Sequence, residues 1–560
     1  MFVRVKTTPN SPRKSVQICE TYRNKGVVKQ KILRYIGIAI DDREEKKLKD
    51  LAAETMAIML LEKENESAQQ SLFPLTNDDA MHAIKNKAGR PRRKKLEDIL
   101  PPDQVLLTDV REKSRIIEGV HEVGGAVFDE LYAPLLSNKR MMQSLKDVVL
   151  ARLAKPTSKH RAQQDLEKRF GKKHDLDNIY RMMDALFPKI GEVKRLTFEK
   201  TRSLFPDKID LLLFDVTTLY FESTEMDELR NFGYSKDHRF NTTQVVLALA
   251  TNQDGLPIGY ELFEGNKAEV STLVAAIESW KKLFNIDSVC FVGDRAMFTE
   301  KNIKLLEVHR YHYIIAAKLK KLPNTLQQEI CKEENYRVTV LKQELAWIGE
   351  FNYKDARLIV SYKSKRAQKD QKERLQVISK IEKTIGKNGN PHNLITNAGV
   401  KQFVTKDEDA SIRIDENKIV KSAQWDGLHG VITNLSEDSA ESILARYSRL
   451  WVIEESFRIN KHTLQMRPIF HWKPERIHAH IAICYMTFSL LRHLQYRVNL
   501  TQKISIDSIL DELLHVQSSI HIHKKTKAKY RLPGHFSNEA RKIYKTFNLE
   551  RSLDATVYLD

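Results

Sequence analysis

The spacing of hydrophobic and polar positions divides the chain into regions of different predicted structure. In residues 42–65, apolar side chains recur at helical spacing behind an acidic first turn, which predicts a helix. Two alternating, basic segments before it are joined through a turn at Gly26, which predicts a β-hairpin. The pattern therefore predicts an N-terminal hairpin and helix over residues 1–65, followed by a polar, basic linker over residues 66–111.

Two further regions have apolar positions at helical spacing and many basic residues. Residues 112–205 are predicted to be helical and to form a DNA-binding region, although a helical bundle with a basic exterior explains the same pattern. Residues 501–560 are predicted to be a basic helical tail.

The middle of the chain changes to the pattern of buried strands. Residues 206–317 predict three consecutive strands, then a helix, a strand, a helix and a strand, which indicates an α/β sheet whose first part is antiparallel. Residues 318–426 interrupt this order and predict a mostly β insertion, in which residues 411–424 have the pattern of a hairpin. Residues 427–500 then predict one strand followed by long helices.

Charge changes the picture more than any other bulk property. The 560 residues contain 93 Lys and Arg against 74 Asp and Glu, a formal net charge of +19. Basic residues spread over several segments favour a polyanionic partner such as nucleic acid, with a solubilising basic surface as the alternative.

Cysteine usage and hydropathy exclude several classes of protein. The four cysteines are far apart and form no CxxC motif, which argues against a disulfide framework or a cysteine zinc site. No apolar run is long enough for a membrane span, and the start lacks the apolar region of a signal peptide. A cytoplasmic, nucleoid-associated bacterial protein with no membrane partner is expected.

A short basic motif lies inside the predicted linker. The stretch AGRPRRKK, residues 88–95, resembles an AT-hook, in which Arg90 and Arg92 would enter a narrow A·T minor groove. A plain charged linker is the alternative reading of these eight residues.

Two carboxylates follow strands that are predicted to be fully buried. Asp215 comes after Leu-Leu-Leu-Phe, and Asp294 comes after Val-Cys-Phe-Val-Gly. Buried carboxylates are usually paired or bound to metal, and sites in open α/β sheets collect at strand ends. Either residue alone could instead cap the following loop.

A third acid lies in the segment YSRLWVIEESFRINK, residues 447–461. At about 100° per residue, one face of a single helix carries Tyr447, Leu450, Glu454, Arg458 and Lys461. Glu454 could pair with Arg458 four residues later, or it could bind a metal ion while its basic neighbours contact phosphates. Trp451 is predicted to lie in the core, with stacking on a flipped base as the alternative.

The three carboxylates together suit a pair of hard cations. Asp215, Asp294 and Glu454 could converge on two Mg²⁺ ions, with Mn²⁺ able to substitute, because these metals prefer oxygen ligands. Two such ions activate an attacking oxygen and stabilise the leaving oxygen of a phosphodiester.

The residues around these acids resemble insertion-sequence transposases of the DDE class. The similarity rests on FDVTTLYF around Asp215, VGDRAMFT around Asp294 and the segment around Glu454. The last segment matches the Y-(2)-R-(3)-E-(6)-K signature of that family at Tyr447, Glu454 and Lys461. It departs where the signature has Arg, because the chain has Leu450 there.

The resemblance implies a fold and an activity. The fold is α/β, with an RNase H-like (retroviral-integrase-like) catalytic core in residues 206–317 and 427–500, interrupted by the mostly β insertion. The activity is that of a DNA transposase, which binds the terminal inverted repeats, hydrolyses the element ends with Mg²⁺ and joins the 3′-OH to target DNA.

The resemblance also implies roles for individual residues. Asp215, Asp294 and Glu454 become catalytic metal ligands, and Tyr447 and Lys461 become DNA contacts. Arg458 is expected to supply the phosphate contact that Leu450 cannot make. Arg295 follows the second Asp and either reaches a phosphate or pairs with a nearby acid.

The expected partners are double-stranded DNA, as element end and as target, and a second copy of the chain in the synaptic complex. Two other functions stay open. One is an RNase H-like nuclease that cuts without joining, and the other is a DNA-binding descendant of a transposase that has lost catalysis.

Overall fold

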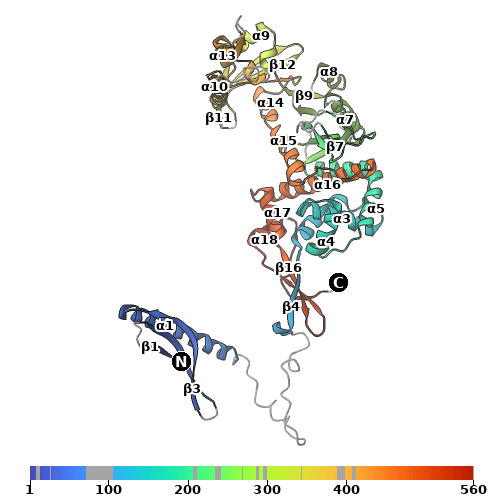
Figure 1. Ribbon diagram of the computed structural model, residues 1–560. Coiled ribbons are helices and arrows are strands. Elements are labelled where there is room, and N and C mark those ends of the chain that lie inside the picture. Colours follow the sequence, from blue (N-terminus) through green and yellow to red (C-terminus); the bar gives the residue numbers. More distant parts are fainter. Residues whose placement is uncertain are drawn as a thin grey trace. The chain divides into compact units, whose positions relative to one another are not determined.

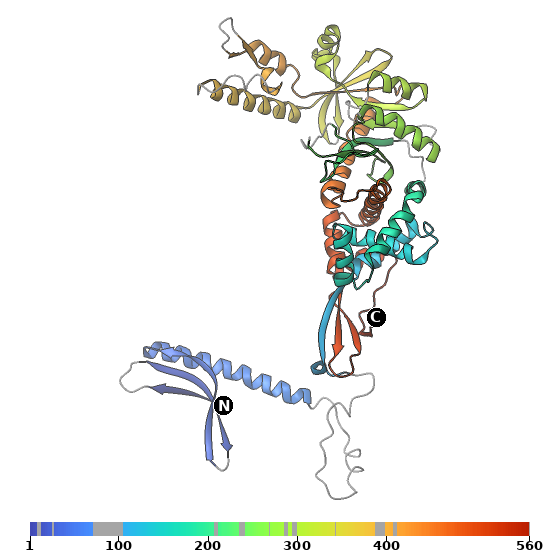
Figure 2. The same cartoon turned by 45° about the vertical axis from the view of Figure 1, so that its right-hand side comes forward.

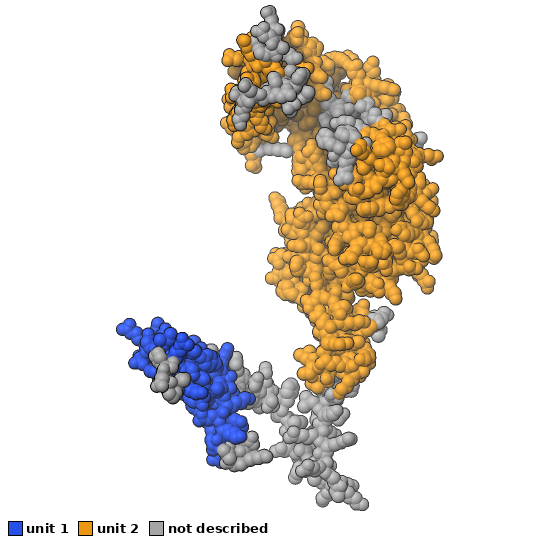
Figure 3. All heavy atoms as spheres, in the orientation of Figure 1, with its two compact units in different colours: residues 1–102 blue, residues 103–560 orange. Residues whose placement is uncertain are grey.

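A computed structural model describes most of the chain. The described residues are 1–7, 13–24, 27–70, 105–205, 211–233, 241–267, 269–284, 289–293, 299–341, 343–386, 398–406 and 412–558. They form two compact units, residues 1–102 and residues 103–560, which Figure 3 distinguishes by colour.

The first unit is a three-stranded antiparallel sheet with one helix. Its elements are β1 (Phe2–Thr7), β2 (Lys14–Asn24), β3 (Val27–Ala39) and α1 (Asp42–Gln70). The strand order is β1-β2-β3, so the expected hairpin is present and carries a third strand. Val16, Ile18 and Ala52 form a small buried core between sheet and helix.

Helices and one strand begin the second unit. They are β4 (Val110–Ile117), the π-helix η3 (Val120–Gly124), α2 (Gly125–Tyr132), α3 (Lys139–Ala154), α4 (Lys159–Phe170), α5 (Leu176–Leu186) and α6 (Ile190–Ser203). Asn138 and Ser158 cap α3 and α4 through side-chain hydrogen bonds to free amides of the first turn. Helices α2, α3, α5 and α6 pack around α16 (Pro474–Asn499), which is buried on all sides for most of its length.

A nine-stranded mixed sheet forms the centre of the second unit. Its order is β10-β11-β12-β15-β9-β8-β5-β6-β7. Strands β5 (Leu211–Tyr220), β6 (Gln244–Thr251) and β7 (Pro257–Glu264) are antiparallel, and β8 (Cys290–Gly293) and β9 (His312–Ala316) run parallel to β5. This arrangement agrees with the strand order predicted for residues 206–317.

Two helices cover one face of this sheet. They are α7 (Glu269–Phe284) and α8 (Glu300–Val308), and they follow β7 and β8 in the sequence. Their buried side chains form one core with Leu212, Phe214 and Val216 of β5. The opposite face of β5 belongs to the core that is built on α16.

The insertion extends the central sheet rather than standing apart from it. Strands β10 (Arg337–Leu341), β11 (Glu344–Tyr353) and β12 (Ala356–Tyr362) are antiparallel, and β12 pairs with β15 (Leu428–Thr433), which pairs in turn with β9. The remaining helices and strands here are α9 (Asn324–Ile330), α10 (Ser364–Gly386), α12 (Ala398–Lys401), β13 (Val404–Lys406), β14 (Ile412–Ile414) and α13 (Glu416–Ala423). The described helices of residues 318–426 are together longer than the strands, so the prediction of a mostly β insertion is wrong. The hairpin predicted for residues 411–424 is wrong: β14 pairs with β13, and Asp415 caps a helix that begins directly after it.

The last part of the chain combines helices with a second sheet. Its elements are α14 (Ala440–Tyr447), α15 (Trp451–Arg458), the π-helix η8 (Ile459–Thr463), α16, α17 (Ile506–His515), β16 (Gln517–His523), β17 (Lys529–Pro533), α18 (Asn538–Thr546) and β18 (Thr556–Val557). Strands β18, β17, β16 and β4 form one four-stranded sheet, visible at the foot of the second unit in Figures 1 and 2.

This second sheet overturns two expectations. The tail at 501–560 is not wholly helical, and the region at 112–205 begins with a strand, because β4 pairs with β16 from the other end of the chain. Short 3₁₀-helices complete the description: η2 (Leu107–Asp109), η4 (Phe187–Lys189), η6 (Leu319–Lys321) and η7 (Glu333–Asn335). None of the helices in the described ranges combines the length and the apolar character that crossing a membrane would need.

Candidate active site

Asp215 lies on β5, between β8 on one side and β6 on the other. The described parallel pairing with β8 runs as far as Leu213 opposite Val292, and the antiparallel pairing with β6 continues to Tyr220. The strand therefore continues past Asp215, where the sequence had predicted its end, because β6 pairs with all of its second half. The side chain is half-buried, and its Oδ1 accepts a hydrogen bond from the Val216 amide at 2.7 Å.

The face of β5 that carries Asp215 is the face covered by α15. Side chains alternate along a strand, so Asp215 shares its face with Leu213 and Leu219. Both leucines belong to the same core as Val452 and Phe457 of α15, and α15 packs against β5 and β6. The carboxylate of Asp215 and the helix with the third predicted acid therefore lie on the same side of the sheet.

The two adjacent glutamates of α15 have different surroundings. Glu455 accepts from both terminal nitrogens of Arg492 on α16, each at 3.3 Å, and the Nε of Arg492 donates to the carbonyl of Gly255 at 2.9 Å. The Arg492 side chain is only 4% exposed, so burial lowers its pKa and Glu455 opposes that effect. Glu455 thus fastens α15 to α16 and to the β6–β7 turn.

Glu454 is exposed and makes no ion pair with any residue that the structure describes. The pair with Arg458 that the helical spacing allowed is absent, because Arg458 lies 3.8 Å from Glu455 instead. The ion pair with Arg458 that could have explained an acid at position 454 is therefore made by Glu455.

The segment around Glu454 is not one regular helix. Residues 448–450 form a turn with 3₁₀-type hydrogen bonds, such as the amide of Leu450 to the carbonyl of Tyr447 at 3.0 Å. Beyond Arg458 the chain enters a π-helical turn, in which the amide of Leu464 donates to Ile459 at 2.8 Å. A constant 100° per residue consequently misplaces both ends of the predicted stripe relative to Glu454.

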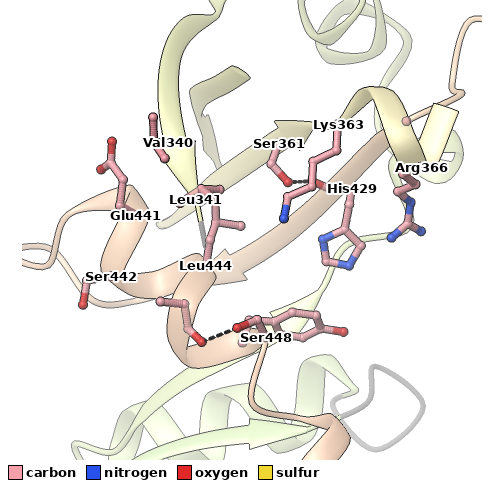
Figure 4. Close-up of a pocket in the computed structure, with 13 residues that line it drawn as sticks. Val340, Leu341, Ser361, Lys363, Arg366, His429, Glu441, Ser442, Leu444 and Ser448 are labelled. Atoms are coloured by element: carbon pink, nitrogen blue, oxygen red, sulfur yellow. Dashed lines mark hydrogen bonds between the residues drawn. The ribbon is translucent and has the colours of Figure 1, made fainter. Parts of the chain in front are cut away.

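Tyr447 faces a cavity of about 560 Å³ between the insertion and α14. Its ring packs on His429 with centroids 5.1 Å apart, and Lys363 and Arg366 line the same cavity (Figure 4). Burial lowers the pKa of His429 to about 4, and the charges of Arg366 and Lys363 add to that effect. The lining of the cavity also includes the acid Glu441 and apolar side chains such as Leu341 and Leu444, so its character is mixed.

The other predicted DNA contacts differ in exposure. The Arg458 side chain is 71% exposed, and Lys461 is half-buried in η8. Asp294, Arg295, Arg90 and Arg92 lie outside the described residues.

Trp451 corrects one expectation. It was predicted to lie in the core, but it is 51% exposed at the start of α15. The irregular turn before it changes its direction from the one that a continuous helix would give.

The oxygen donors that are described fit a hard divalent cation. Asp215 is half-buried and Glu454 is exposed without an ion pair, and carboxylate oxygens are the ligands that Mg²⁺ prefers. Among the described residues, no group of three or more His, Cys, Asp or Glu side chains is close enough to hold a metal ion.

Two residues of this region were missed in the sequence, and each left a signal. Arg492 stands within the apolar stretch TFSLLRHLQY, and a buried guanidinium demands an acid partner. His429 stands in the strand LHGVIT between apolar residues. A polar residue between apolar residues indicates a buried polar group in both cases, but the sequence does not show which residue it pairs with.

The sheet, the Asp on its inner strand β5 and the helix packed over it are the arrangement of an RNase H-like catalytic domain. The family model for the transposase DDE domain matches residues 206–490, which is just over half of the chain. The chain therefore belongs to the DDE transposases, and this membership implies a DNA transposase enzyme. The mixed α/β fold class with an RNase H-like core is confirmed.

Comparison with individual proteins adds little to the family match. No curated protein matches the chain. Among solved structures, the chain is similar to a piggyBac transposase in a synaptic complex with hairpin DNA, at 9% identity and a TM-score of 0.37, over 71% of this chain and 77% of that one.

Proposed function

We propose that the chain is an active transposase that binds the terminal inverted repeats of an insertion sequence, cleaves the element ends and joins the 3′-OH to target DNA. The observation that carries the proposal is the pair of Asp215 and Glu454. Asp215 lies on β5, an inner strand of the sheet, and Glu454 is exposed on α15, which packs over the same face. The other glutamate of that helix, Glu455, is paired with Arg492. Joining two ends requires two catalytic sites, so a homodimer is the proposed synaptic form.

Asp294 is the proposed third ligand. The parallel register pairs Leu213 with Val292, and Asp215 and Asp294 each come two residues later in the sequence. Both acids thus follow the paired residues of two neighbouring parallel strands, β5 and β8, in the sequence, and this order supports the proposal. Asp215, Asp294 and Glu454 would then hold two Mg²⁺ ions.

The chemistry divides between the metals and the chain. When bound, two Mg²⁺ ions supply activation of the attacking oxygen and stabilisation of the leaving oxygen of the phosphodiester. The chain contributes the three carboxylates, and Tyr447, Arg458, Lys461 and Arg295 are proposed to hold DNA phosphates around them. Arg90 and Arg92 are proposed to enter the minor groove of A·T-rich DNA.

The departure from the Y-R-E-K signature supports a specific role for Arg458. Leu450 cannot contact a phosphate, whereas Arg458 is exposed and lies one turn beyond Glu454 on α15. Arg458 is therefore proposed to replace the arginine that the signature has before the glutamate.

The test uses purified protein, a labelled duplex that carries the inverted repeat flanking the gene, and a supercoiled target plasmid, with Mg²⁺ or with EDTA. Wild type is compared with Asp215→Asn, Asp294→Ala and Glu454→Gln, and Glu455→Gln is the matched control. We expect Mg²⁺-dependent cutting and joining in wild type, and a loss of at least about 10²-fold in the first three variants, because each removes a carboxylate that is proposed to hold the Mg²⁺ ions.

The control separates catalysis from stability. Glu455→Gln leaves the buried Arg492 without its counter-charge and is expected to destabilise the fold by about 2 kcal/mol while retaining activity at low temperature. Glu454→Gln is expected to keep the wild-type unfolding midpoint. Cutting without joining would instead indicate a nuclease, and binding without chemistry in any metal would indicate a non-catalytic descendant; activity that survives Glu454→Gln would exclude this glutamate as a ligand.

A further inference from the structure

Strands β4, β16 and β17 form a narrow sheet that projects from the helices of the second unit. Residues 107–115 and 521–531 make up its outer part, which we name the basic ribbon. Figures 1 and 2 both show β4 and β16 extending away from α17 and α18. The register joins Arg111 to Ile522 and His521 to Tyr530, so the ribbon is paired up to its turn.

The basic ribbon carries an excess of positive charge. Residues 521–531 contain five Lys and Arg and no Asp or Glu. On β4, Arg111 and Lys113 are exposed, and Glu112 between them accepts from Arg115 at 3.1 Å. Residues 107–115 contain three Lys and Arg and two acids, Asp109 and Glu112, so the ribbon as a whole has eight cationic residues against two acidic ones.

The turn at the end of the ribbon is ordered by its own lysines. Lys524 donates from Nζ to the carbonyl of Thr108 at 2.6 Å, and Lys527 donates to the carbonyl of Lys524 at 2.9 Å. His523 accepts the amides of Lys525 and Thr526 through Nδ1, at 3.2 and 3.1 Å. Carbonyl partners fix the position of an ammonium group but leave its charge in place, so these lysines are oriented and still positive.

The base of the ribbon is fastened separately. Glu118 receives Arg531 at 2.7 Å and Arg551 at 2.6 Å, and the Arg551 side chain is 2% exposed. These partners anchor the sheet to the helices, so the charge at the tip is not needed to hold the ribbon in place.

We propose that the basic ribbon binds the phosphate backbone of duplex DNA outside the catalytic core, without reading sequence. The hydrogen bonds of Lys524 and Lys527 hold two ammonium groups in fixed positions at the tip of the ribbon. Such groups are attracted to the dense negative charge of the phosphates along a duplex. The proposal rests on the proposed function, since it adds a second DNA contact to a protein that acts on DNA.

The test measures binding in EDTA, where no strand is cut. The full chain and the triple variant Lys524→Gln/Lys525→Gln/Lys527→Gln are titrated against a fluorescent duplex at several salt concentrations. The control variant Lys281→Gln/Lys301→Gln/Lys304→Gln removes the same charge from α7 and α8. These two helices cover the face of the central sheet that lies opposite α15. The charge-retaining variant Lys524→Arg/Lys525→Arg/Lys527→Arg tests whether positive charge is what matters, and the unfolding midpoint and circular dichroism of the Gln variant check that it still folds.

Counterion release sets the expected size of the effect. If each lysine neutralises one phosphate, the slope of log K against log salt falls by roughly 2 to 3 in the Gln variant, with affinity lowered by about ten- to a hundredfold at 0.1 M salt. The control and the Arg variant are expected to keep the wild-type slope.

The outcomes separate this proposal from the one before it. An unchanged slope and affinity in the Gln variant would overturn the ribbon site while leaving transposase activity possible, and an equal loss in the α7–α8 control would reduce it to a net-charge effect. A ribbon-dependent slope in a protein that never cuts DNA with Mg²⁺ would support the ribbon site and overturn the proposed function. A wild type that binds no duplex would overturn both.

Discussion

Glu454 and Glu455 are neighbours in the sequence, and helix geometry gives them different partners. A rotation of about 100° turns Glu455 toward Arg492 on α16 and leaves Glu454 on the exposed side of α15. A buried guanidinium needs a counter-charge, so Arg492 explains Glu455. Nothing in the packing of the described residues requires an acid at Glu454, so the role of this residue as a metal ligand stays a proposal.

Gly255 offers a residue-scale prediction about the same anchor. It has φ +82° in the β6–β7 turn, and a Cβ there would lie 2.1 Å from Nη2 and 2.7 Å from Cζ of Arg492. Gly255→Ala is expected to destabilise the fold by about 2–4 kcal/mol, through backbone strain and displacement of the buried guanidinium. Urea unfolding of the purified protein measures the change.

The control for this prediction is Gly191→Ala in α6. A Cβ on Gly191 would meet nothing within 4 Å, so the change should stabilise the helix by up to about 1 kcal/mol. Equal effects at the two glycines would contradict the role given to Arg492.

At the scale of elements, local pattern predicted the core and failed where strands pair across the chain. The strands β5 to β9 contain apolar runs, and helical periods separate β7, β8 and β9, so the sheet and the acid on β5 could be predicted. The pairing of β16 with β4 could not be predicted, because β4 lies some 400 residues earlier and no local signal shows such a pairing. The hairpin of β16 with β17 is local, but its turn is a run of lysines without Gly or Pro, and it was missed as well. The short alternation of Ile520 and Ile522 in β16 was the available signal.

For the candidate site, too, local sequence pattern predicted which residues to consider but not how their side chains are oriented. The identities of Asp215 and Glu454 follow from motifs, but the exposure of Trp451 and the direction of Tyr447 depend on the turn at residues 448–450. That turn changes the helical period without any Gly or Pro to mark it, so periodicity alone could not place the residues on either side.

The contact between α4 and α16 carries a pH-dependent prediction. Lys159 begins α4, is 4% exposed and lies 3.2 Å from Nδ1 of His480, with Arg152 nearby. Burial, and then the charge of Arg152, lower the pKa of Lys159 to about 7. The unfolded chain therefore binds a proton that the folded chain has released between pH 7 and its ordinary value of 10.5, and stability is expected to rise with pH through that window.

Lys159→Met should remove this dependence. The variant is expected to exceed wild type in stability at pH 7, by an amount on the order of a few kcal/mol that shrinks toward zero near pH 10. Denaturant unfolding at pH 7, 8.5 and 10 measures the difference, and Lys155→Met at an exposed neighbouring position is the control. Parallel stability curves for wild type and Lys159→Met would rule out a buried, deprotonated lysine.

At the scale of the whole molecule, the two units have separate cores. Among the described residues of the first unit, the buried cluster consists of Val16, Ile18 and Ala52, with partly buried side chains such as Leu48 and Met56 packed against it. The clusters around α16 and the central sheet consist of residues of the second unit. A core of that size stabilises little, and most of the apolar surface removed from water belongs to residues 103–560. The strands β1 to β3 and helix α1 are consequently expected to unfold at a lower temperature than the rest.

This separation predicts the behaviour of a truncated chain. Residues 103–560 expressed alone should keep the main thermal transition within about 2 °C of the full chain, because the described core clusters of this unit consist of its own residues. The full chain should show an additional transition at lower temperature that the truncated chain lacks, and differential scanning calorimetry of both proteins measures this. A large fall in the main transition on truncation would show that the first unit stabilises the catalytic domain, and the two units would then have to be treated as one cooperative structure.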